Sequence, residues 1–312
     1  MHEPNGSQPH IAAGFPPEVG KLVVVTYSTS GIGFDIAVSL ASAGADVIVT
    51  GRSSSDGHEA LSRIRPVAPH ALVRFEKLDL GSLASVADFA NRLNRAGRPI
   101  DLLVNNANSL VLLKRELTPD GFEIHLALNF LSHFALTARL LPLLRGSKQA
   151  KVVQLTSTGR HHGEIHLDDL QLESNYTPLK AYSQSKLAMM LFALELQRQS
   201  DTRQWGITGS SAQPLGTHAA LLANATEVTP SMTWYKRALG FVPDRAPSSN
   251  GAAEKLPSET EADHRAPATK SLAELIGPPV PEALDMRVLD PVMARKLWEV
   301  ATGLTRVEWP EN

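Results

Sequence analysis

The sequence predicts an α/β fold with a doubly wound parallel sheet, and three observations support this prediction. From residue 21 onward, short runs of β-branched residues alternate with segments of helical periodicity, which is the pattern of repeated βαβ units. Runs such as LVVV and DLLV are apolar without interruption, as expected of parallel strands buried on both faces. The first of these runs leads through a glycine-containing loop directly into an amphipathic segment, as a βα unit does.

Each run sets the bounds of an expected element. Strands are expected at residues 22–26, 46–50, 72–77, 100–105, 151–156 and 206–212. The helices between them are expected at residues 32–43, 57–65, 82–96, 118–144 and 178–200. One more helix is expected at residues 290–302, where an aspartate can cap the start, a proline occupies the first turn and an apolar stripe follows.

The expected domain organisation is one domain with a long insertion. Residues 1–20 are expected to form a flexible lead, and residues 21–312 a single domain. After Pro214 the sequence becomes rich in proline and polar residues, so residues 215–280 are expected to form a lid or insertion at the substrate site. Apolar residues within this segment indicate at least one amphipathic helix: Met232, Trp234, Tyr235, Leu239 and Phe241.

The bulk composition restricts the classes of function. The chain is 43% hydrophobic and 20% charged, with a formal net charge of −2, so its charge gives no reason to expect nucleic acid or an anionic membrane as a partner. It contains no cysteine, which excludes disulfides and cysteine-ligated metal. The N-terminal residues lack the basic and apolar regions of a secretory signal, and no apolar run approaches the roughly 20 residues of a membrane span. We therefore expect a cytoplasmic protein without a membrane span, and a homo-oligomer stays open.

The loop after the first expected strand reads TYSTSGIG, from Thr26 to Gly33. A strand, a tight loop and a helix in this order can hold the pyrophosphate of a dinucleotide at the helix N-terminus. Gly31 and Gly33 lie at the helix start, where backbone N–H groups meet phosphate. Tyr27 occupies a position where a glycine normally lets the backbone approach the ligand. We expect dinucleotide binding to survive this change.

Tyr182 and Lys186 lie four residues apart in the expected helix 178–200 and therefore share one helix face. A free tyrosine has a pKa near ~10. A neighbouring ammonium lowers that pKa towards the range useful for proton transfer. The other interpretation is an ordinary helix with an exposed tyrosine and a solvated lysine, and the spacing alone does not exclude it.

Two further polar residues lie where the fold would bring them to the same region. Ser157 follows the expected strand 151–156, at the edge where ligands bind to an open parallel sheet. It could donate a hydrogen bond to a substrate carbonyl, or cap the loop that follows. Asn129 lies in the apolar stretch IHLALNFLSHFALT, where an asparagine is unfavourable for a helix. Its amide is therefore either satisfied by a buried water or functional.

Together these residues resemble the short-chain dehydrogenase/reductase family, over about the first 215 residues and more loosely over the tail ARKLWEVATGLTRV. The stretch TSTGRHHGEIHLDDL and the expected helix 118–144 resemble the retinol-dehydrogenase-like branch. The resemblance implies a Rossmann-type fold with Tyr182 as catalytic acid/base, while Lys186 lowers the tyrosine pKa and holds the nicotinamide ribose. It also implies that Ser157 orients and polarises the substrate carbonyl and that Asn129 holds the water of a proton relay.

The end of the second expected strand bears on the choice of coenzyme. An acidic residue there would bind both hydroxyls of the adenosine ribose and repel a 2′-phosphate. The sequence has Gly51 and Arg52 instead, and a guanidinium offers charge-assisted hydrogen bonds to a phosphate. We therefore favour NADP(H) over NAD(H). The alternative is that Arg52 is a solvated surface residue.

The resemblance implies further coenzyme contacts. Asp79 and Leu80 would contact the adenine, although Asp79 could instead cap the helix that begins near Ser82. Asn105 and Asn106 match the family's NNAG pattern, which steadies the sheet while its loop lines the nicotinamide cleft. The complete set of expected coenzyme-binding residues is Thr26, Ser28, Ser30, Gly31, Ile32, Gly33, Arg52, Asp79, Leu80, Asn106, Ala107, Tyr182, Lys186, Pro214 and Thr217.

The sequence departs from the family pattern at three positions, where Tyr27, Asn108 and Leu215 replace glycines. All three would line the coenzyme cleft. A non-glycine residue forced into the left-handed conformation costs about 1–3 kcal/mol, which is about one to two decades of affinity if the cost falls on binding. Asn108 is the mildest change because asparagine tolerates this conformation.

The leading hypothesis is an enzyme that transfers a hydride between a nicotinamide and a carbonyl or secondary alcohol, with reduction of a bulky hydrophobic ketone or aldehyde as the expected direction. One alternative is a dinucleotide-binding sensor or scaffold with little or no turnover, which the altered glycines favour. A weaker one is a partner-docking role for residues 224–270. No metal is expected, since His161 and His162 have no third ligand at suitable spacing. The residues expected to line the substrate pocket, each of which could equally pack in the core or lid, are Leu110, Val111, Leu112, His161, His162, Leu215, Leu221, Leu222, Met232, Trp234 and Phe241.

Overall fold

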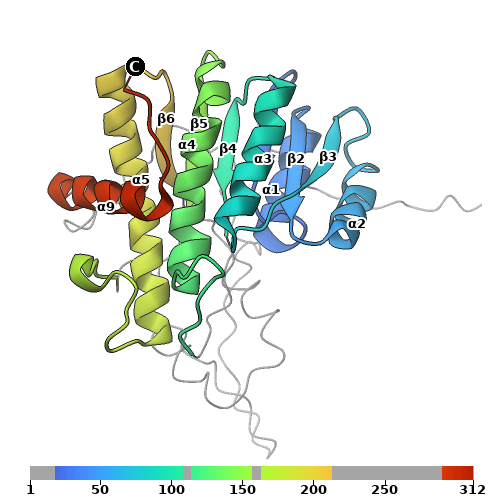
Figure 1. Ribbon diagram of the computed structural model, residues 1–312. Coiled ribbons are helices and arrows are strands. Elements are labelled where there is room, and N and C mark those ends of the chain that lie inside the picture. Colours follow the sequence, from blue (N-terminus) through green and yellow to red (C-terminus); the bar gives the residue numbers. More distant parts are fainter. Residues whose placement is uncertain (1–17, 108–113, 157–162, 213–289, 312) are drawn as a thin grey trace, which may run out of the picture. The chain divides into compact units, whose positions relative to one another are not determined.

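The computed structural model describes residues 18–107, 114–156, 163–212 and 290–311, and everything below refers to these ranges (Figure 1). The strands are β1 (Leu22–Val25), β2 (Asp46–Gly51), β3 (Val73–Lys77), β4 (Leu102–Asn105), β5 (Lys151–Leu155) and β6 (Thr208–Ala212). The helices are α1 (Gly31–Ser42), α2 (Ser54–Ile64), α3 (Leu83–Ala96), η1 (Leu126–Leu131), α4 (Ser132–Arg145), the short 3₁₀ helix η3 (Leu167–Asp169), α5 (Pro178–Arg203) and α9 (Pro291–Thr305).

The six strands form one sheet in the order β3-β2-β1-β4-β5-β6, and each neighbouring pair is parallel. The strand order reverses between β1 and β4, which makes the carboxyl ends of these two strands the topological switch point. Ligands of open parallel sheets bind at this place. The structure thus confirms the doubly wound α/β fold expected from the sequence.

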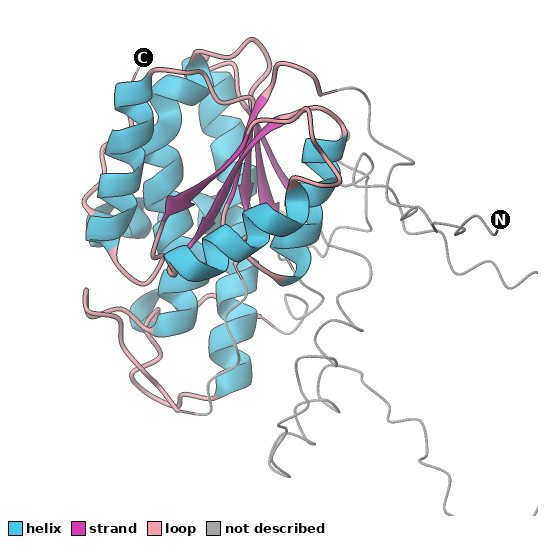
Figure 2. Cartoon of the chain, turned by 90° about the vertical axis from the view of Figure 1, so that its right-hand side faces the viewer, coloured by secondary structure: helices cyan, strands magenta, loops and turns pink. Residues whose placement is uncertain are grey.

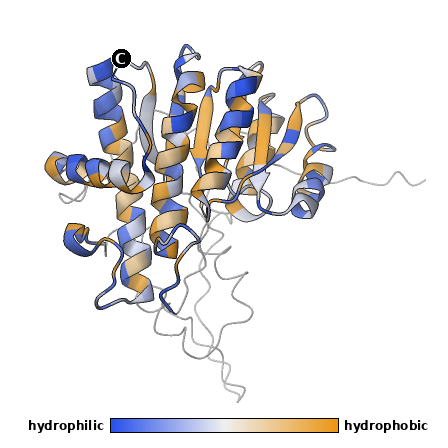
Figure 3. Ribbon diagram, in the orientation of Figure 1, coloured by the Kyte–Doolittle hydropathy of each residue, from blue (hydrophilic) through white to orange (hydrophobic). Residues whose placement is uncertain are grey.

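Helices cover both faces of the sheet because successive strand residues point to opposite sides (Figure 2). Val23 and Val25 pack into the core formed with α1 and α2. Leu22 and Val24 pack into a second core, which also contains residues of α3, α4, α5 and α9. The central strands are correspondingly apolar along their length in Figure 3. Burial on both faces is the physical reason for the uninterrupted apolar runs in the sequence.

One expected helix differs from the structure. Residues 118–144 were expected to form a single helix, but the helical region begins only at Ile124. Thr118 and Gly121 form a turn instead, in which the Gly121 N–H donates to the Thr118 carbonyl at 2.9 Å and Gly121 has a φ of 82°. The proline and glycine of the sequence TPDG favour this turn over a helix. Between this start and α4 the helix is not α-helical, because η1 is a π-helix.

The segment Leu126–Arg145 is, among the described residues, long and apolar enough to cross a membrane. The sequence was expected to hold no apolar run of this length. Within its 20 residues, however, 83% of the most apolar window is buried inside the protein. That degree of burial is typical of a core helix, and α4 packs against α3 and the neighbouring π-turn.

Candidate active site

The loop after β1 has the geometry of an anion-binding loop at a helix N-terminus. Helix α1 begins at Gly31, which has a φ of 58° and no atom within 4 Å of the position a Cβ would take. Gly33 is tightly enclosed, because a Cβ there would lie 2.4 Å from both the Tyr27 carbonyl oxygen and Asn106 Nδ2. The loop therefore leaves space above Gly31 and uses Gly33 for close packing against the end of β4.

Thr26 and Ser28 hold this loop from within the protein. Both are fully buried. The Ser28 hydroxyl donates to the Val25 carbonyl at 2.7 Å and accepts from the Thr50 N–H at 2.9 Å. The Thr26 hydroxyl lies 2.8 Å from the Asn106 N–H, which donates to it. The two hydroxyls thus brace the loop, while Ser30 is the N-cap residue of α1 and Ile32 lies in its first turn.

Tyr27 has a φ of 49°, in the left-handed region that favours glycine. Its backbone is held on both sides: its N–H donates to Thr50 Oγ1 at 3.2 Å, and its carbonyl accepts from Asn106 Nδ2 at 3.0 Å. The departure from the family pattern at this position is therefore a strained residue in an otherwise well-bonded loop. Asn108 and Leu215, the two other departures, lie outside the described residues.

Tyr182 and Lys186 are one turn apart on α5, as the sequence predicts. Thr177 caps this helix by accepting from the Lys180 N–H at 3.2 Å, and Pro178 occupies its first turn. Lys186 is 4% exposed, and its ammonium donates long hydrogen bonds to the carbonyls of Ala107 at 3.3 Å and Leu155 at 3.4 Å. These carbonyls lie just beyond β4 and at the end of β5.

Burial lowers the pKa of Lys186 from 10.5 to about 8. The lysine Nζ lies 5.8 Å from the centre of the Tyr182 ring, within range of an electrostatic interaction with its π-system. The Tyr182 side chain itself is largely buried, at 8% exposure. The phenol and the ammonium are thus neighbours in a site with little solvent, where their mutual electrostatic effect is stronger than in water.

Asn129 lies in the π-turn η1, in which the Ser132 N–H bonds to the Ala127 carbonyl five residues earlier. Turns of this type are frequent at functional sites. The Asn129 amide donates from Nδ2 to Ser185 Oγ at 2.8 Å, and the Ser185 hydroxyl donates to the Tyr182 carbonyl at 2.7 Å. Asn129 is therefore joined to the turn of α5 that carries Tyr182 and Lys186. The sequence raised the question of what this buried amide binds, and Ser185 is one answer.

On the adenosine side, Arg52 follows the end of β2 and is exposed. Within the part of the chain that the structure describes, its guanidinium makes no hydrogen bond or ion pair and is accessible to a ligand. Asp79 Oδ1 accepts from the Gly81 N–H at 2.9 Å, and α3 is capped by Ser82 rather than by Asp79. Leu80 is buried beside it.

Several expected site residues cannot be placed. Ser157, Pro214 and Thr217 lie outside the described residues, as do the whole 215–280 segment and every residue expected to line the substrate pocket. The roles assigned to them stay predictions. Among the described residues no group of three or more histidine, aspartate or glutamate side chains is arranged to hold a metal ion.

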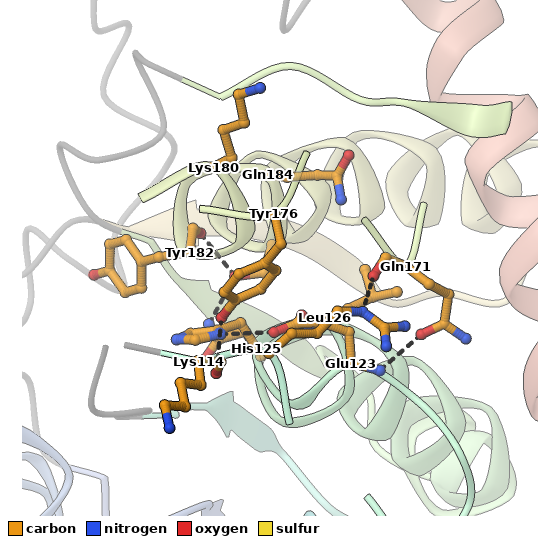
Figure 4. Close-up of polar contacts among 12 residues, drawn as sticks. Lys114, Glu123, His125, Leu126, Gln171, Tyr176, Lys180, Tyr182 and Gln184 are labelled. Atoms are coloured by element: carbon orange, nitrogen blue, oxygen red, sulfur yellow. Dashed lines mark hydrogen bonds and ion pairs between the residues drawn. The ribbon is translucent and has the colours of Figure 1, made fainter. Parts of the chain in front are cut away.

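Sequence reasoning missed a buried carboxylate–imidazole pair next to Tyr182. Glu123 Oε1 lies 2.7 Å from His125 Nδ1, and Glu123 Oε2 accepts from the Leu126 N–H at 2.8 Å. The His125 ring meets the Tyr182 ring edge to face, with centres 6.5 Å apart. Figure 4 shows His125 between Glu123 and the tyrosine. The signal was present as two ionisable residues in the otherwise apolar stretch FEIHLAL.

The second missed residue is His133, which is fully buried in α4. Its Nδ1 lies 2.8 Å from the Asn129 carbonyl oxygen, and its Nε2 lies 2.9 Å from Thr26 Oγ1. Asn129, His133 and Thr137 are spaced four residues apart and form a polar stripe on an apolar helix. At the far end of the stripe Asn105 donates to Thr137 Oγ1 at 3.2 Å.

Comparison with known proteins agrees with this geometry. The profile of the short chain dehydrogenase family matches residues 21–229. Polyprenol dehydrogenase from Mus musculus is 41% identical over 236 residues, which cover 74% of this chain and 69% of that protein. Retinol dehydrogenase 11 from Mus musculus is 33% identical over 296 residues, covering 93% and 88%.

Among solved structures, an uncharacterized protein from Mycobacterium paratuberculosis has the same fold with a TM-score of 0.71 and 29% identity, over 95% of this chain and 97% of that chain. The family match covers most of the chain, and the dehydrogenase relatives confirm the branch expected from the sequence. The chain belongs to the short-chain dehydrogenase family, in its retinol-dehydrogenase-like branch.

Proposed function

We propose that this chain is an NADP(H)-dependent oxidoreductase that interconverts a bulky hydrophobic carbonyl compound and its alcohol, with reduction as the favoured direction. The observation that carries the proposal is the placement of Tyr182 and Lys186. They share one face of α5, and the lysine ammonium is fixed at the carboxyl ends of β4 and β5 by the Ala107 and Leu155 carbonyls. Family membership supports the same reaction class.

The described residues fit a nicotinamide coenzyme. The open space above Gly31 and the start of α1 suit a pyrophosphate, because the first backbone N–H groups of a helix are free to bind anions. Lys186, buried beyond the end of β4, would hold the nicotinamide ribose. When bound, the coenzyme supplies the hydride, while the protein supplies position and a proton.

The chain's own contribution to the reaction is the movement of one proton. In reduction, the Tyr182 hydroxyl donates its proton to the substrate oxygen, and in oxidation the phenolate takes it back. The neighbouring Lys186 ammonium stabilises the phenolate electrostatically, and burial of the pair strengthens this effect. Asn129 fixes the turn of α5 that carries both residues through Ser185. Ser157, by resemblance, would hydrogen-bond the substrate carbonyl.

Arg52 supports NADP(H) over NAD(H). Its exposed guanidinium follows β2, next to where the adenosine ribose would lie, and is not engaged by another described residue. It can therefore form charge-assisted hydrogen bonds with a 2′-phosphate. The hydrophobic substrate is supported by the relatives, which are named for polyprenol and retinol, both apolar alcohols.

The proposal is tested by following the hydride itself. The protein is incubated with NADPH carrying deuterium at the nicotinamide C4 and with a panel of bulky ketones and aldehydes, and the products are analysed by mass spectrometry. We expect alcohols with one deuterium on the carbinol carbon, and faster transfer from NADPH than from NADH. Replacing Arg52 by Glu should reverse that coenzyme preference. Absence of deuterated product from every compound, despite saturating coenzyme, would contradict the proposal.

A second function is favoured by one specific observation. Tyr27 adopts the left-handed conformation at φ 49° in the coenzyme loop, where the family uses glycine. A protein that binds a dinucleotide as a sensor or scaffold needs the loop but not a rapid exchange of coenzyme. This alternative predicts NADPH binding without turnover of any carbonyl compound, so the deuterium experiment and a coenzyme titration together separate the two functions.

A further inference from the structure

His133 joins two parts of the site that are distant in sequence. It lies on α4, and its two ring nitrogens contact Thr26 at the end of β1 and the backbone carbonyl of Asn129 in the π-turn. Thr26 begins the proposed coenzyme loop, and Asn129 is joined through Ser185 to the turn of α5 that carries Tyr182. A single imidazole therefore lies between the coenzyme loop and the proton-donating helix.

The chemistry of the two partners fixes which ring nitrogen carries the proton. The Asn129 carbonyl can only accept, so His133 Nδ1 must be protonated at their separation of 2.8 Å. Burial lowers the pKa of His133 to about 4, so the ring is neutral at physiological pH and Nε2 is bare. Lys186, whose charge also disfavours the imidazolium, acts in the same direction.

The bare Nε2 then requires a donor, and Thr26 supplies it. The Thr26 hydroxyl oxygen is 2.9 Å from Nε2, 2.7 Å from the Asn106 carbonyl and 3.3 Å from the Val104 carbonyl, and its one proton can serve only one of these acceptors. Donation to either carbonyl would leave the buried ring nitrogen unsatisfied, which is costly. The Asn106 N–H donates to the same hydroxyl oxygen at 2.8 Å. The result is a directed chain from Asn106 through Thr26 and His133 to Asn129.

We propose that His133 is a positioning residue for the reaction, because it ties the coenzyme loop at Thr26 to the Asn129 turn that places Tyr182. The inference rests on the proposed function for what binds in the loop. It goes beyond that function because His133 is not proposed to contact the coenzyme or the substrate. Instead, His133 holds the coenzyme loop and the Asn129 turn together. The backbone carbonyl of Asn129 and the hydroxyl of Thr26 are its two points of attachment.

Two variants separate the two attachments. In His133→Asn the amide nitrogen replaces Nδ1 and keeps the bond to Asn129, but the contact with Thr26 is lost. In His133→Gln the amide oxygen replaces Nε2 and still accepts from Thr26, but Asn129 loses its donor. We expect the dissociation constant of NADPH to rise by about tenfold in His133→Asn with little change in kcat, the scale of one lost buried hydrogen bond. In His133→Gln we expect kcat to fall by about tenfold with little change in NADPH affinity.

The exposed His70 provides matched controls, since His70→Asn and His70→Gln change the same atoms away from the site. If His133 had only a structural role, each variant would change NADPH affinity and kcat together, or would change neither of them, whatever its thermal stability. Each of these two results overturns the proposal.

A measurement on the unmodified protein covers the case in which either variant does not fold. In NMR spectra of ¹⁵N-labelled protein, His133 Nδ1 should be protonated and Nε2 should not be. The ring should not change its protonation state when the pH of the sample is varied between 5 and 8. A protonated Nε2, or an imidazolium near neutral pH, overturns the proposal. This result does not depend on turnover or on coenzyme binding, so it is distinguishable from failure of the proposed function.

Discussion

Tyr27 offers a direct test of the strain located in the coenzyme loop. At φ 49° a side chain with a Cβ costs about 1–2 kcal/mol relative to the right-handed conformation. Glycine removes this strain but adds about 0.5–1 kcal/mol of unfolded-chain entropy. The difference between the mid-range values leaves about 0.75 kcal/mol in favour of glycine. Because Tyr27→Gly and Tyr27→Ala both remove the ring, comparing these two variants isolates the backbone effect.

The control is Glu59, an exposed residue within helix α2. There glycine is less favourable than alanine by about 1 kcal/mol. We therefore expect opposite signs at the two positions: Tyr27→Gly unfolds at higher urea than Tyr27→Ala, whereas Glu59→Gly unfolds at lower urea than Glu59→Ala. NADPH titration of the same proteins measures how much of the strain at position 27 weakens coenzyme binding. Each ~1.4 kcal/mol of strain raises the NADPH dissociation constant tenfold. A Tyr27→Gly protein less stable than Tyr27→Ala would refute the reasoning.

Three further predictions concern the packing and charge of the site. Gly33→Ala places a Cβ 2.4 Å from the Tyr27 carbonyl oxygen and from Asn106 Nδ2. We expect the free energy of unfolding in urea to fall by about 1–3 kcal/mol and NADPH to bind more weakly in a fluorescence titration. An unchanged free energy of unfolding would contradict the described packing. Glu123→Ala removes the carboxylate that binds the Leu126 N–H and the buried His125 ring. We expect the free energy of unfolding in urea to fall by about 3 kcal/mol, and a decrease below ~1 kcal/mol would contradict the Glu123–His125 pair. Lys186 has its pKa lowered by burial to about 8, so the unfolded chain binds more protons between that pH and about 10.4. Stability should accordingly rise through this window by about 3 kcal/mol relative to Lys186→Met, and parallel pH profiles of the two proteins would contradict a lowered pKa of Lys186 in the folded protein.

Much of the fold follows from local sequence features. The central strands β1 and β4 were recognisable because burial on both faces demands apolar runs, as at Leu22–Val25. The start of α9 followed from an aspartate cap and a proline, which the structure confirms. The start of the fourth helical region was predicted too early, at residue 118, because the sequence TPDG forms a turn there and the helix begins only at Ile124.

The candidate site was predictable where its spacing is local, and not where its contacts are distant. Tyr182 and Lys186 are four residues apart, and helix geometry alone brings them together. The carbonyl of Ala107, which holds the Lys186 ammonium, is 79 residues away, and the Thr26 contact of His133 spans 107 residues. Nothing in the local pattern specifies such partners. The π-turn at Asn129 could not be predicted either, because the periodicity of apolar residues indicates a helix without distinguishing a π-turn from an α-helical turn.

The central claim is that the Tyr182 phenol, next to the Lys186 ammonium, donates the proton in carbonyl reduction. It is tested most directly by the rate of carbonyl reduction at saturating NADPH in Tyr182→Phe, with Tyr176→Phe as the matched control. Tyr176 lies on the same side of the protein, but its hydroxyl is 3.4 Å from the Lys114 carbonyl and has no role in the proposed proton transfer (Figure 4). We expect Tyr182→Phe to lose more than about a hundredfold in rate at saturating NADPH, and Tyr176→Phe to keep its rate. Equal rates in the parent and Tyr182→Phe would contradict the account.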